Sequence, residues 1–199
     1  MAATLARLSL LPGDALVIVD VQNDFLLGGS LAVPNGDRVV AVLNAYIAEF
    51  EAKGLPVFAT RCWHPADHCS FKARGGPWPV HCVAGTPGAA FAPGLRLPPL
   101  ANIISKATEP ARDAYSGFSA TDLAQRLSAA GAKRIFVGGL ATDYCVLNTV
   151  KDGFAAGFAV ILLADAIAAV NVEPDDGKNA EREMGRLGAV PTRHDLLAG

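Results

Sequence analysis

Short hydrophobic runs alternate along the chain with segments in which hydrophobic residues recur at helical spacing. The runs are rich in β-branched residues and are bounded by Gly, Pro, Asn or Asp, which is typical of strands buried on both faces of a sheet. They predict strands at residues 15–21, 55–61, 102–106, 133–140 and 158–166. The segments between them predict helices at residues 34–54, 119–131, 142–157 and about 176–187.

Two of the predicted helices carry recognisable start and stop residues. Asn35 or Asp37 stands near the start of the first, and Gly54 follows its last hydrophobic position. Ser119 is the expected N-cap of the second, and Gly131 its terminator. Strands that alternate with helices in this way predict a mostly parallel sheet covered by helices, which is a three-layer α/β fold.

Composition and charge narrow the class of protein. The chain has 199 residues, of which 51% are hydrophobic and 18% charged, and this suits a single domain over residues 1–199 with a sizeable core. Lys and Arg total 17 against 19 Asp and Glu, without a basic block, so neither nucleic acid nor an anionic membrane is an expected partner. No apolar stretch reaches the ~18 residues of a spanning helix, and no leader pattern is visible. We expect a cytoplasmic protein with a small-molecule partner, and the sequence is compatible with a homo-oligomer.

Residues 62–101 interrupt the alternation with many Gly and Pro residues and no sustained period. An irregular insertion of this length is functional or disordered, and its aromatic residues and histidines argue against disorder, so we expect it to form a site. The insertion starts within the segment TRCWHPADHCSF (60–71), which contains two cysteines and two histidines. The four cysteines lack a CxxC pair and are too few for a disulfide framework, so reduced thiols are expected. They are Cys62, Cys69, Cys82 and Cys145.

Reactive residues stand where the predicted strands end. In an open parallel sheet the ligand crevice lies beyond the carboxyl ends of the strands. Asp20 and Lys106 occupy such ends, and Cys145 follows another by about five residues. Either charge buried alone would cost on the order of several kcal/mol, so we expect the two to pair. One interpretation is that the two form a structural ion pair. The other is that Asp20 is a catalytic base beside a thiol, with its ionisation controlled by the ammonium group of Lys106.

Cys145 is the candidate nucleophile. Ala141 or Thr142 can begin a helix that places the sulfur in its first turn, where the backbone N–H groups and the helix dipole favour a thiolate. The same N–H groups can hold an oxyanion. The alternative is that Cys145 is a small hydrophobic residue buried on a helix face.

The cysteine and histidines of the loop are candidate metal ligands. Pro65 keeps His64 extended, so Cys62 and His64, two positions apart, point to one side. His81 can complete a set of three from the far end of the loop. The alternative is that these are ordinary polar loop residues. His194 is assigned no role.

Five segments together resemble the nicotinamidase/pyrazinamidase branch of the isochorismatase-like cysteine hydrolases. They occur in order between residues 14 and 166, over most of the chain. The resemblance implies a doubly wound α/β fold and hydrolysis of nicotinamide, or a pyrazinamide-like amide, to the acid and ammonia. The segments are DVQNDF with GGSLAV (20–33), CWHPADHCSF, PWPVHCVAGTPGA (77–89), SKATEPARDAYSGF (105–118) and GLATDYCV (139–146).

Carried over residue by residue, the resemblance assigns the catalytic roles. The family's catalytic Asp falls on Asp20, its Lys on Lys106 and its nucleophile on Cys145. Its oxyanion hole corresponds to the backbone N–H groups of Ala141 and Cys145, with a cis peptide between Leu140 and Ala141. The residues that match its aromatic substrate pocket are Phe25, Trp78 and Tyr115.

The family's metal site corresponds to position 62 and three histidines, with one departure. The matching residues are Cys62, His64, His81 and His68, the last as a fourth ligand or a neighbour of the ligands. The family has Asp where this chain has Cys62. Because a thiolate with imidazoles suits tetrahedral zinc, we expect one divalent metal ion, zinc ahead of iron or manganese. A metal-free protein is the alternative.

Other functions remain open at this point. A related amidase acting on a carbamoyl, ureido or maleamate-type compound is the first alternative, although those relatives generally lack the histidine loop. Isochorismatase activity itself is disfavoured because that branch lacks the nucleophilic cysteine. A non-catalytic metal-binding or thiol-sensing protein is disfavoured by the intact set of Asp20, Lys106 and Cys145.

Overall fold

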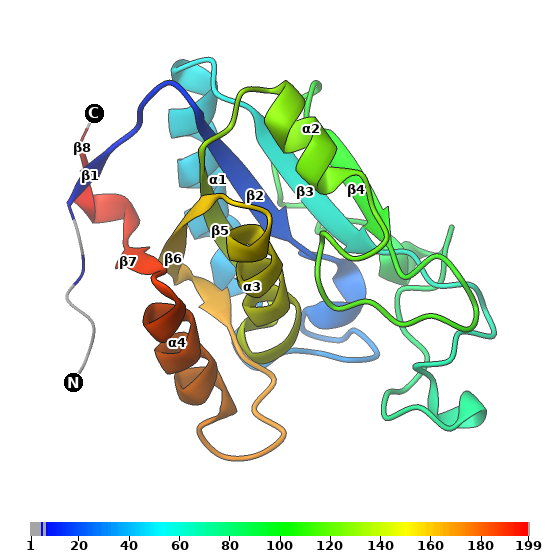
Figure 1. Cartoon of the computed structure of the whole chain (residues 1–199). Helices are drawn as coiled ribbons and strands as arrows, with labels where there is room; N and C mark the ends of the chain where they lie inside the picture. Colours follow the sequence, from blue (N-terminus) through cyan, green and yellow to red (C-terminus); the bar gives the residue numbers. More distant parts are fainter. Residues whose placement is uncertain (1–4, 6, 199) are drawn as a thin grey trace.

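The computed structural model describes residue 5 and residues 7–198 and is built on a six-stranded parallel sheet (Figure 1). The strand order is β4-β3-β2-β5-β6-β7. The chain therefore starts in the middle of the sheet, fills one half and returns to fill the other, which is the doubly wound arrangement. The strands are β2 (Asp14–Val19), β3 (Val57–Cys62), β4 (Asn102–Lys106), β5 (Arg134–Leu140), β6 (Ala159–Ala168) and β7 (Val190–Thr192). A separate parallel pair joins β1 (Leu8–Ser9) to β8 (Leu197–Ala198).

Helices cover both faces of this sheet. Alternate residues of β2 point to opposite sides, as strand geometry requires. Leu16 and Ile18 pack in one hydrophobic cluster with α1 (Arg38–Ala52). Val17 and Val19 pack in a second cluster, with residues of α2 (Leu123–Ala129), α3 (Leu147–Ala155) and α4 (Asp176–Leu187). Figure 1 shows α1 behind the sheet and the other three helices in front, so the predicted three-layer fold is confirmed.

The second predicted helix starts later than expected. Ser119 is not its N-cap, because α2 begins at Leu123 and Asp122 precedes it. Ala120 has a φ of +54°, a left-handed conformation that cannot belong to a right-handed helix. The hydroxyl of Thr121 donates a hydrogen bond to the carbonyl of Gly117, so these residues form a turn before the helix.

The helix predicted at 142–157 is divided. It opens with one wide turn of π-helix, η4 (Thr142–Val146), and continues as α3. Such turns are rare and frequently occur at functional sites. This one holds Cys145 at the carboxyl end of β5.

The long loop folds back over the carboxyl ends of the strands. Within residues 62–101 the regular structure is limited to two short 3₁₀ turns, η2 (Lys72–Arg74) and η3 (Pro87–Ala89). Isolated bridges pair His64 with Val83, and Phe71 with Trp78. The 3₁₀ turn η1 (Asn23–Phe25), directly after β2, contacts η3, and a further turn η5 (His194–Leu196) precedes β8.

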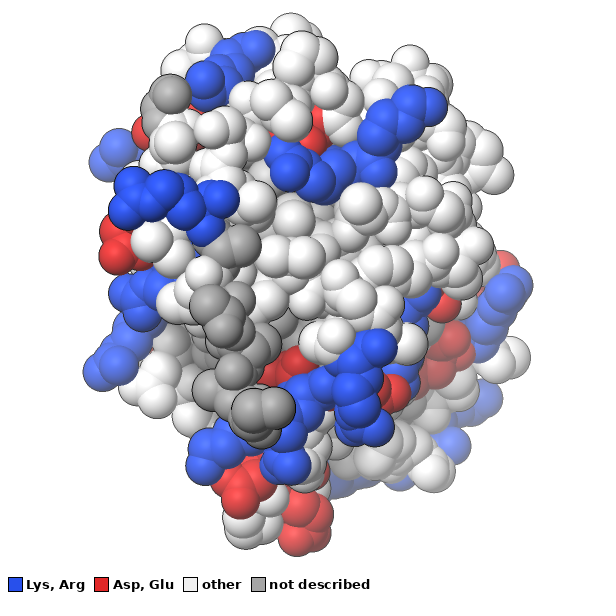
Figure 2. Space-filling model, turned by 60° about the vertical axis from the view of Figure 1, so that its left-hand side comes forward, with Lys and Arg blue, Asp and Glu red and all other residues white. Residues whose placement is uncertain are grey.

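Surface charge is mixed on the face seen in Figure 2. Blue Lys and Arg side chains lie close to red Asp and Glu side chains, and a broad uncharged area separates the charged groups. Across the part of the chain that the structure describes, no helix has the length and hydrophobicity needed to span a membrane.

Candidate active site

The strand ends bring the predicted reactive residues together. Asp20 follows the central strand β2, and Cys62 and Lys106 are the last residues of β3 and β4, where they pair in register. Cys145 comes from η4, which follows β5. The crevice lies beside β2 and β5, where the strand order reverses and doubly wound sheets bind their ligands.

Lys106 lies at the centre of this cluster. Its Nζ is 2.9 Å from Asp20 Oδ2, and it donates hydrogen bonds to Cys62 Sγ at 3.0 Å and Cys145 Sγ at 3.5 Å. It also donates to the carbonyl of Ala114 at 3.0 Å. Asp20 and Lys106 are 0% and 1% exposed, so each charge is stabilised by the other, and the predicted pairing is confirmed.

The ammonium group also decides what the cluster can bind. Ligand atoms of Asp20, Cys62 and Cys145 lie within 4.8 Å of one another, close enough for a metal ion. Because Lys106 Nζ contacts all three, a cation placed among them would meet a positive charge at hydrogen-bond distance. The cluster therefore suits proton transfer and nucleophilic chemistry rather than metal binding.

Asp20 has the environment of a general base. Burial raises its pKa to about 6 and the nearby Cys62 adds to this, while Lys106 and the hydroxyl of Thr60 oppose the rise. The Thr60 hydroxyl donates to Asp20 Oδ1 at 2.7 Å. A carboxylate with a pKa near the working pH exchanges protons efficiently. The backbone of Asp20 has a φ of +49°, a conformation that is rare outside glycine and concentrated at functional sites.

The two thiols of the cluster influence each other. A hydrogen bond from Cys145 and the charge of Lys106 hold the pKa of Cys62 well below its ordinary value, against the effect of burial. The same hydrogen bond, with burial, raises the pKa of Cys145. This direction means that a neighbouring base would help to activate Cys145.

The peptide before Ala141 is cis, as the family resemblance implied. The carbonyl of Ala141 accepts hydrogen bonds from the backbone N–H groups of Tyr144 and Val146, which closes the wide turn of η4 around Cys145. This turn leads directly into α3, so Cys145 lies at the amino-terminal end of a continuous helical segment. Partial positive charge at that end favours a negative sulfur or oxygen.

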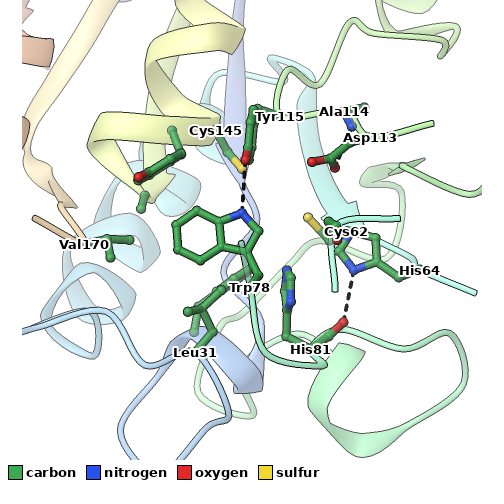
Figure 3. Close-up of a pocket in the computed structure, with 14 residues that line it drawn as sticks. Leu31, Cys62, His64, Trp78, His81, Asp113, Ala114, Tyr115, Cys145 and Val170 are labelled. Atoms are coloured by element: carbon green, nitrogen blue, oxygen red, sulfur yellow. Dashed lines mark hydrogen bonds between the residues drawn. The ribbon is translucent and has the colours of Figure 1, made fainter. Parts of the chain in front are cut away.

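One pocket is lined by the two thiols of the cluster, Cys62 and Cys145, and by residues of the loop (Figure 3), whereas Asp20 and Lys106 are buried and do not line it. The predicted aromatic residues Phe25, Trp78 and Tyr115 all line it. Trp78 Nε1 donates to the Tyr115 hydroxyl at 3.0 Å, which fixes the indole ring between Cys145 and His81. Among the lining residues that the sequence did not single out, three have bulky hydrophobic or aromatic side chains, and one of them precedes the nucleophile. They are Leu31, Tyr144 and Val170.

Two histidines of the pocket are oriented as metal ligands usually are. His64 Nδ1 faces the carbonyl of His81 at 3.0 Å, and His81 Nδ1 faces the carbonyl of Pro79 at 2.8 Å. A carbonyl only accepts hydrogen bonds, so each Nδ1 carries the proton and each Nε2 keeps its lone pair. Metal-binding histidines typically donate their second nitrogen in this way. Cys62 lines the same pocket, and a sulfur with two imidazoles is a donor type that zinc prefers. Among the described residues, however, the ligand atoms of Cys62, His64 and His81 do not all lie within 4.8 Å of one another, so the structure does not bring the predicted set together as a closed site.

His68 and Asp113 lie next to this set. His68 has both nitrogens engaged, Nδ1 with the Ser70 hydroxyl at 2.7 Å and Nε2 with the Arg112 carbonyl at 3.1 Å. Its ring stacks on His64 with centroids 4.3 Å apart, which favours the role of a neighbour of the ligands. Ligand atoms of His64, His68 and Asp113 lie within 4.8 Å of one another, so Asp113 adds a carboxylate that the sequence did not single out.

Gln22 holds the backbone of Cys62 in place and was also not singled out. Its side chain accepts from the N–H of Cys62 at 2.8 Å and donates to the carbonyl of the same residue at 2.8 Å. It donates further to the carbonyl of Ala89 at 2.9 Å and is fully buried. Its place in DVQNDF did not indicate this role, because the partner lies 40 residues further along the chain.

The comparison with family models decides the classification, because the isochorismatase domain matches residues 14–195. The chain belongs to the isochorismatase family. Within this family it is 38% identical over 201 residues to a nicotinamidase of Escherichia coli (strain K12), covering 90% of this chain and 94% of that protein. The predicted resemblance to the nicotinamidase/pyrazinamidase branch is confirmed.

Solved structures of the isochorismatase family agree with the fold. A pyrazinamidase of Pyrococcus horikoshii in complex with zinc is 49% identical, with a TM-score of 0.88 over 92% of this chain and 99% of that one. PnC1 from L. infantum in complex with nicotinate is 36% identical, with a TM-score of 0.87 over 100% of this chain and 99% of that one.

Proposed function

We propose that this protein is a cysteine amidohydrolase that converts nicotinamide to nicotinate and ammonia. The observation that carries the proposal is the contact of Lys106 with Asp20 and with Cys145, whose side chain lines a pocket together with flat aromatic side chains. The similarity to nicotinamidases and pyrazinamidases supports the choice of a heteroaromatic amide. Flat rings such as those of Trp78 and Phe25 suit a planar pyridine.

In the first half of the reaction Cys145 becomes acylated. Asp20 takes the proton of the Cys145 thiol, and the sulfur attacks the amide carbon. The oxygen of the tetrahedral intermediate is held by the backbone N–H groups of Ala141 and Cys145. The C–N bond then breaks, and Asp20 returns its proton to the departing ammonia, leaving a thioester.

In the second half water replaces ammonia. Asp20, again ionised beside Lys106, takes a proton from water, which attacks the thioester carbon. The C–S bond breaks and nicotinate leaves, while the proton held by Asp20 returns to Cys145. Lys106 favours the ionised form of Asp20 at the start of each half and therefore acts as electrostatic support.

A divalent metal ion, zinc first, belongs to the same proposal. Its ligands would be His64, His81 and Cys62, with His68 beside them or as a fourth ligand. The donor set is the one preferred by zinc, and a pyrazinamidase of this family was solved with zinc. When bound, the ion would anchor the ring nitrogen of the substrate and so orient the amide toward Cys145.

The test is release of ammonia and nicotinate from nicotinamide by the purified protein. Pyrazinamide and carbamoyl, ureido and maleamate-type amides form the comparison panel. The proposal expects the highest kcat/KM with nicotinamide or pyrazinamide. Higher kcat/KM with an open-chain amide would instead establish the related amidase activity. Release of ammonia from none of them would contradict an amidohydrolase.

A further inference from the structure

The side chains of Cys62 and Cys145 are close neighbours in the structure. Their sulfur atoms are within 4.8 Å of each other, and Lys106 Nζ donates a hydrogen bond to each, at 3.0 and 3.5 Å. Amide hydrolysis as proposed uses only one of these sulfurs, that of Cys145. The proposed role of Cys62 as a metal ligand does not require it to lie beside the nucleophile, so this contact needs another explanation.

We propose that Cys62 and Cys145 form a reversible disulfide when a small peroxide oxidises the nucleophile. The two sulfurs must approach by less than about 3 Å to reach the S–S bond length of about 2.05 Å. Neither Cys69 nor Cys82 lines the pocket that Cys62 and Cys145 share.

The surrounding structure determines which oxidants reach the pair. Cys62 is 4% exposed and Cys145 6% exposed, so bulky thiols and disulfides have little access. Both cysteines nevertheless line the pocket, and a small peroxide can enter by the same route as the substrate. Gln22 fixes the backbone of Cys62, and η4 fixes that of Cys145, so the two thiols stay near each other.

The oxidation proceeds in two balanced steps. Cys145 gives its proton to Asp20 and attacks one peroxide oxygen, so that an S–O bond forms and the O–O bond breaks. The departing hydroxide takes the proton from Asp20 and leaves as water. Cys62 sulfur then attacks the sulfenic sulfur, the S–S bond forms, the S–O bond breaks, and the second hydroxide leaves as water with a proton from the Lys106 ammonium group, which solvent replaces. The two thiols lose two electrons, and the peroxide is reduced to two waters.

The consequence is protection of the nucleophile. A sulfenic acid without a neighbouring thiol is oxidised further to sulfinic and sulfonic acids, which ordinary thiol reductants do not reverse. A disulfide stops this sequence and is reduced by thiol exchange. The enzyme would lose activity under oxidation and recover it under reducing conditions.

The experiment treats the full-length, reduced protein with hydrogen peroxide and measures intact mass, non-reduced peptide maps and ammonia release. The parent is expected to lose the mass of two hydrogen atoms, to yield a peptide pair that links residues 62 and 145, and to recover its activity with dithiothreitol. Cys62→Ser is expected to gain two or three oxygen atoms at Cys145, with no recovery of its own starting activity. Cys69→Ser is the matched control and should behave as the parent.

The mass readouts do not depend on which amide the protein hydrolyses. Oxygen atoms added at Cys145 of the parent without a link to residue 62 would overturn the inference. Full recovery of oxidised Cys62→Ser with dithiothreitol would overturn it as well. If Cys62→Ser does not fold, the peptide map of the parent decides the question alone.

Discussion

Lys106 is the residue that joins the carboxylate and the two thiols into one unit. It contacts Asp20 and Cys145, and both charged side chains of the pair are buried. Groups that act on the same proton give losses that do not add when they are removed together. The proposed mechanism therefore predicts that the losses of activity caused by replacing Asp20 and Cys145 do not add in a double variant.

Removal of the base is expected to lower the rate strongly. Asp20→Asn should reduce kcat/KM for nicotinamide by about 10²- to 10⁴-fold, the usual contribution of a general base, and Cys145→Ala should leave only a small residual rate. The double variant should be no less active than Cys145→Ala alone. Cys69→Ser is the control and should retain activity. Additive losses, measured as ammonia release, would indicate separate roles for Asp20 and Cys145.

The pKa of Asp20 predicts the acidic limb of the pH profile. Burial raises this pKa to about 6, and the base is active only when ionised, so kcat/KM should fall as the pH drops through about 6. Thr60 favours the ionised form through its 2.7 Å hydrogen bond, so Thr60→Val should move the limb upward, by about one unit. Thr60→Ser keeps the hydroxyl and should leave the limb in place. If the midpoint of the acidic limb is the same in Thr60→Val as in the parent, ionisation of Asp20 does not cause the limb.

At the scale of elements, the position of the site follows from strand order and from the approach of β5 to β2. Gly139 of β5 has a φ of +124°, and a Cβ there would fall against the backbone of Val19 in β2. Glycine is thus required one residue before Leu140, where β5 leads into η4. The packing of these two strands determines where the nucleophile lies relative to Asp20.

Gly139→Ala is expected to destabilise the fold severely. Both the left-handed conformation and the collision with Val19 oppose it, so the free energy of unfolding should fall by about 3 kcal/mol or more. Gly157→Ala is the matched control, with a φ of +88° but no atom within 4 Å of the new Cβ, and should cost only about 1–2 kcal/mol. Urea denaturation followed by circular dichroism measures both. Equal losses would show that the contact with Val19 is unimportant.

The same elements show what the sequence could and could not predict. The strand ends at Asp20 and Lys106 were predictable because parallel strands share one ligand-binding edge, whatever their detailed packing. The late start of α2 was not, because the left-handed conformation of Ala120 has no marker in its residue type. The support of Cys62 by Gln22 was not predictable either, because it depends on contacts across 40 residues of chain.

At the scale of the whole molecule, two sets of residues meet in one pocket. The segments at the strand ends contribute the thiols Cys62 and Cys145, and the loop 62–101 contributes Trp78 and two histidines. Cys62 belongs to both sets, since it is the last residue of β3 and the first of the loop. Its sulfur receives a hydrogen bond from Lys106 and also contacts His64, a contact that raises the pKa of His64 against the effect of burial. The role of this one residue therefore determines how far the whole site resembles that of its relatives.

Metal content separates the two roles that remain open for Cys62. If it is a ligand, protein purified without added metal should contain about one equivalent of divalent metal, mainly zinc. Cys62→Ala should hold less and His81→Ala little, whereas His194→Ala, outside the pocket, should match the parent. The cobalt-substituted parent should show thiolate-to-metal charge-transfer absorption that is absent from Cys62→Asp, because only a sulfur ligand produces it. A metal-free parent together with metal binding by Cys62→Asp would show that the cysteine marks a lost metal site. In that case the substrate would be expected among the open-chain amides, whose hydrolysis needs no anchor for a ring nitrogen.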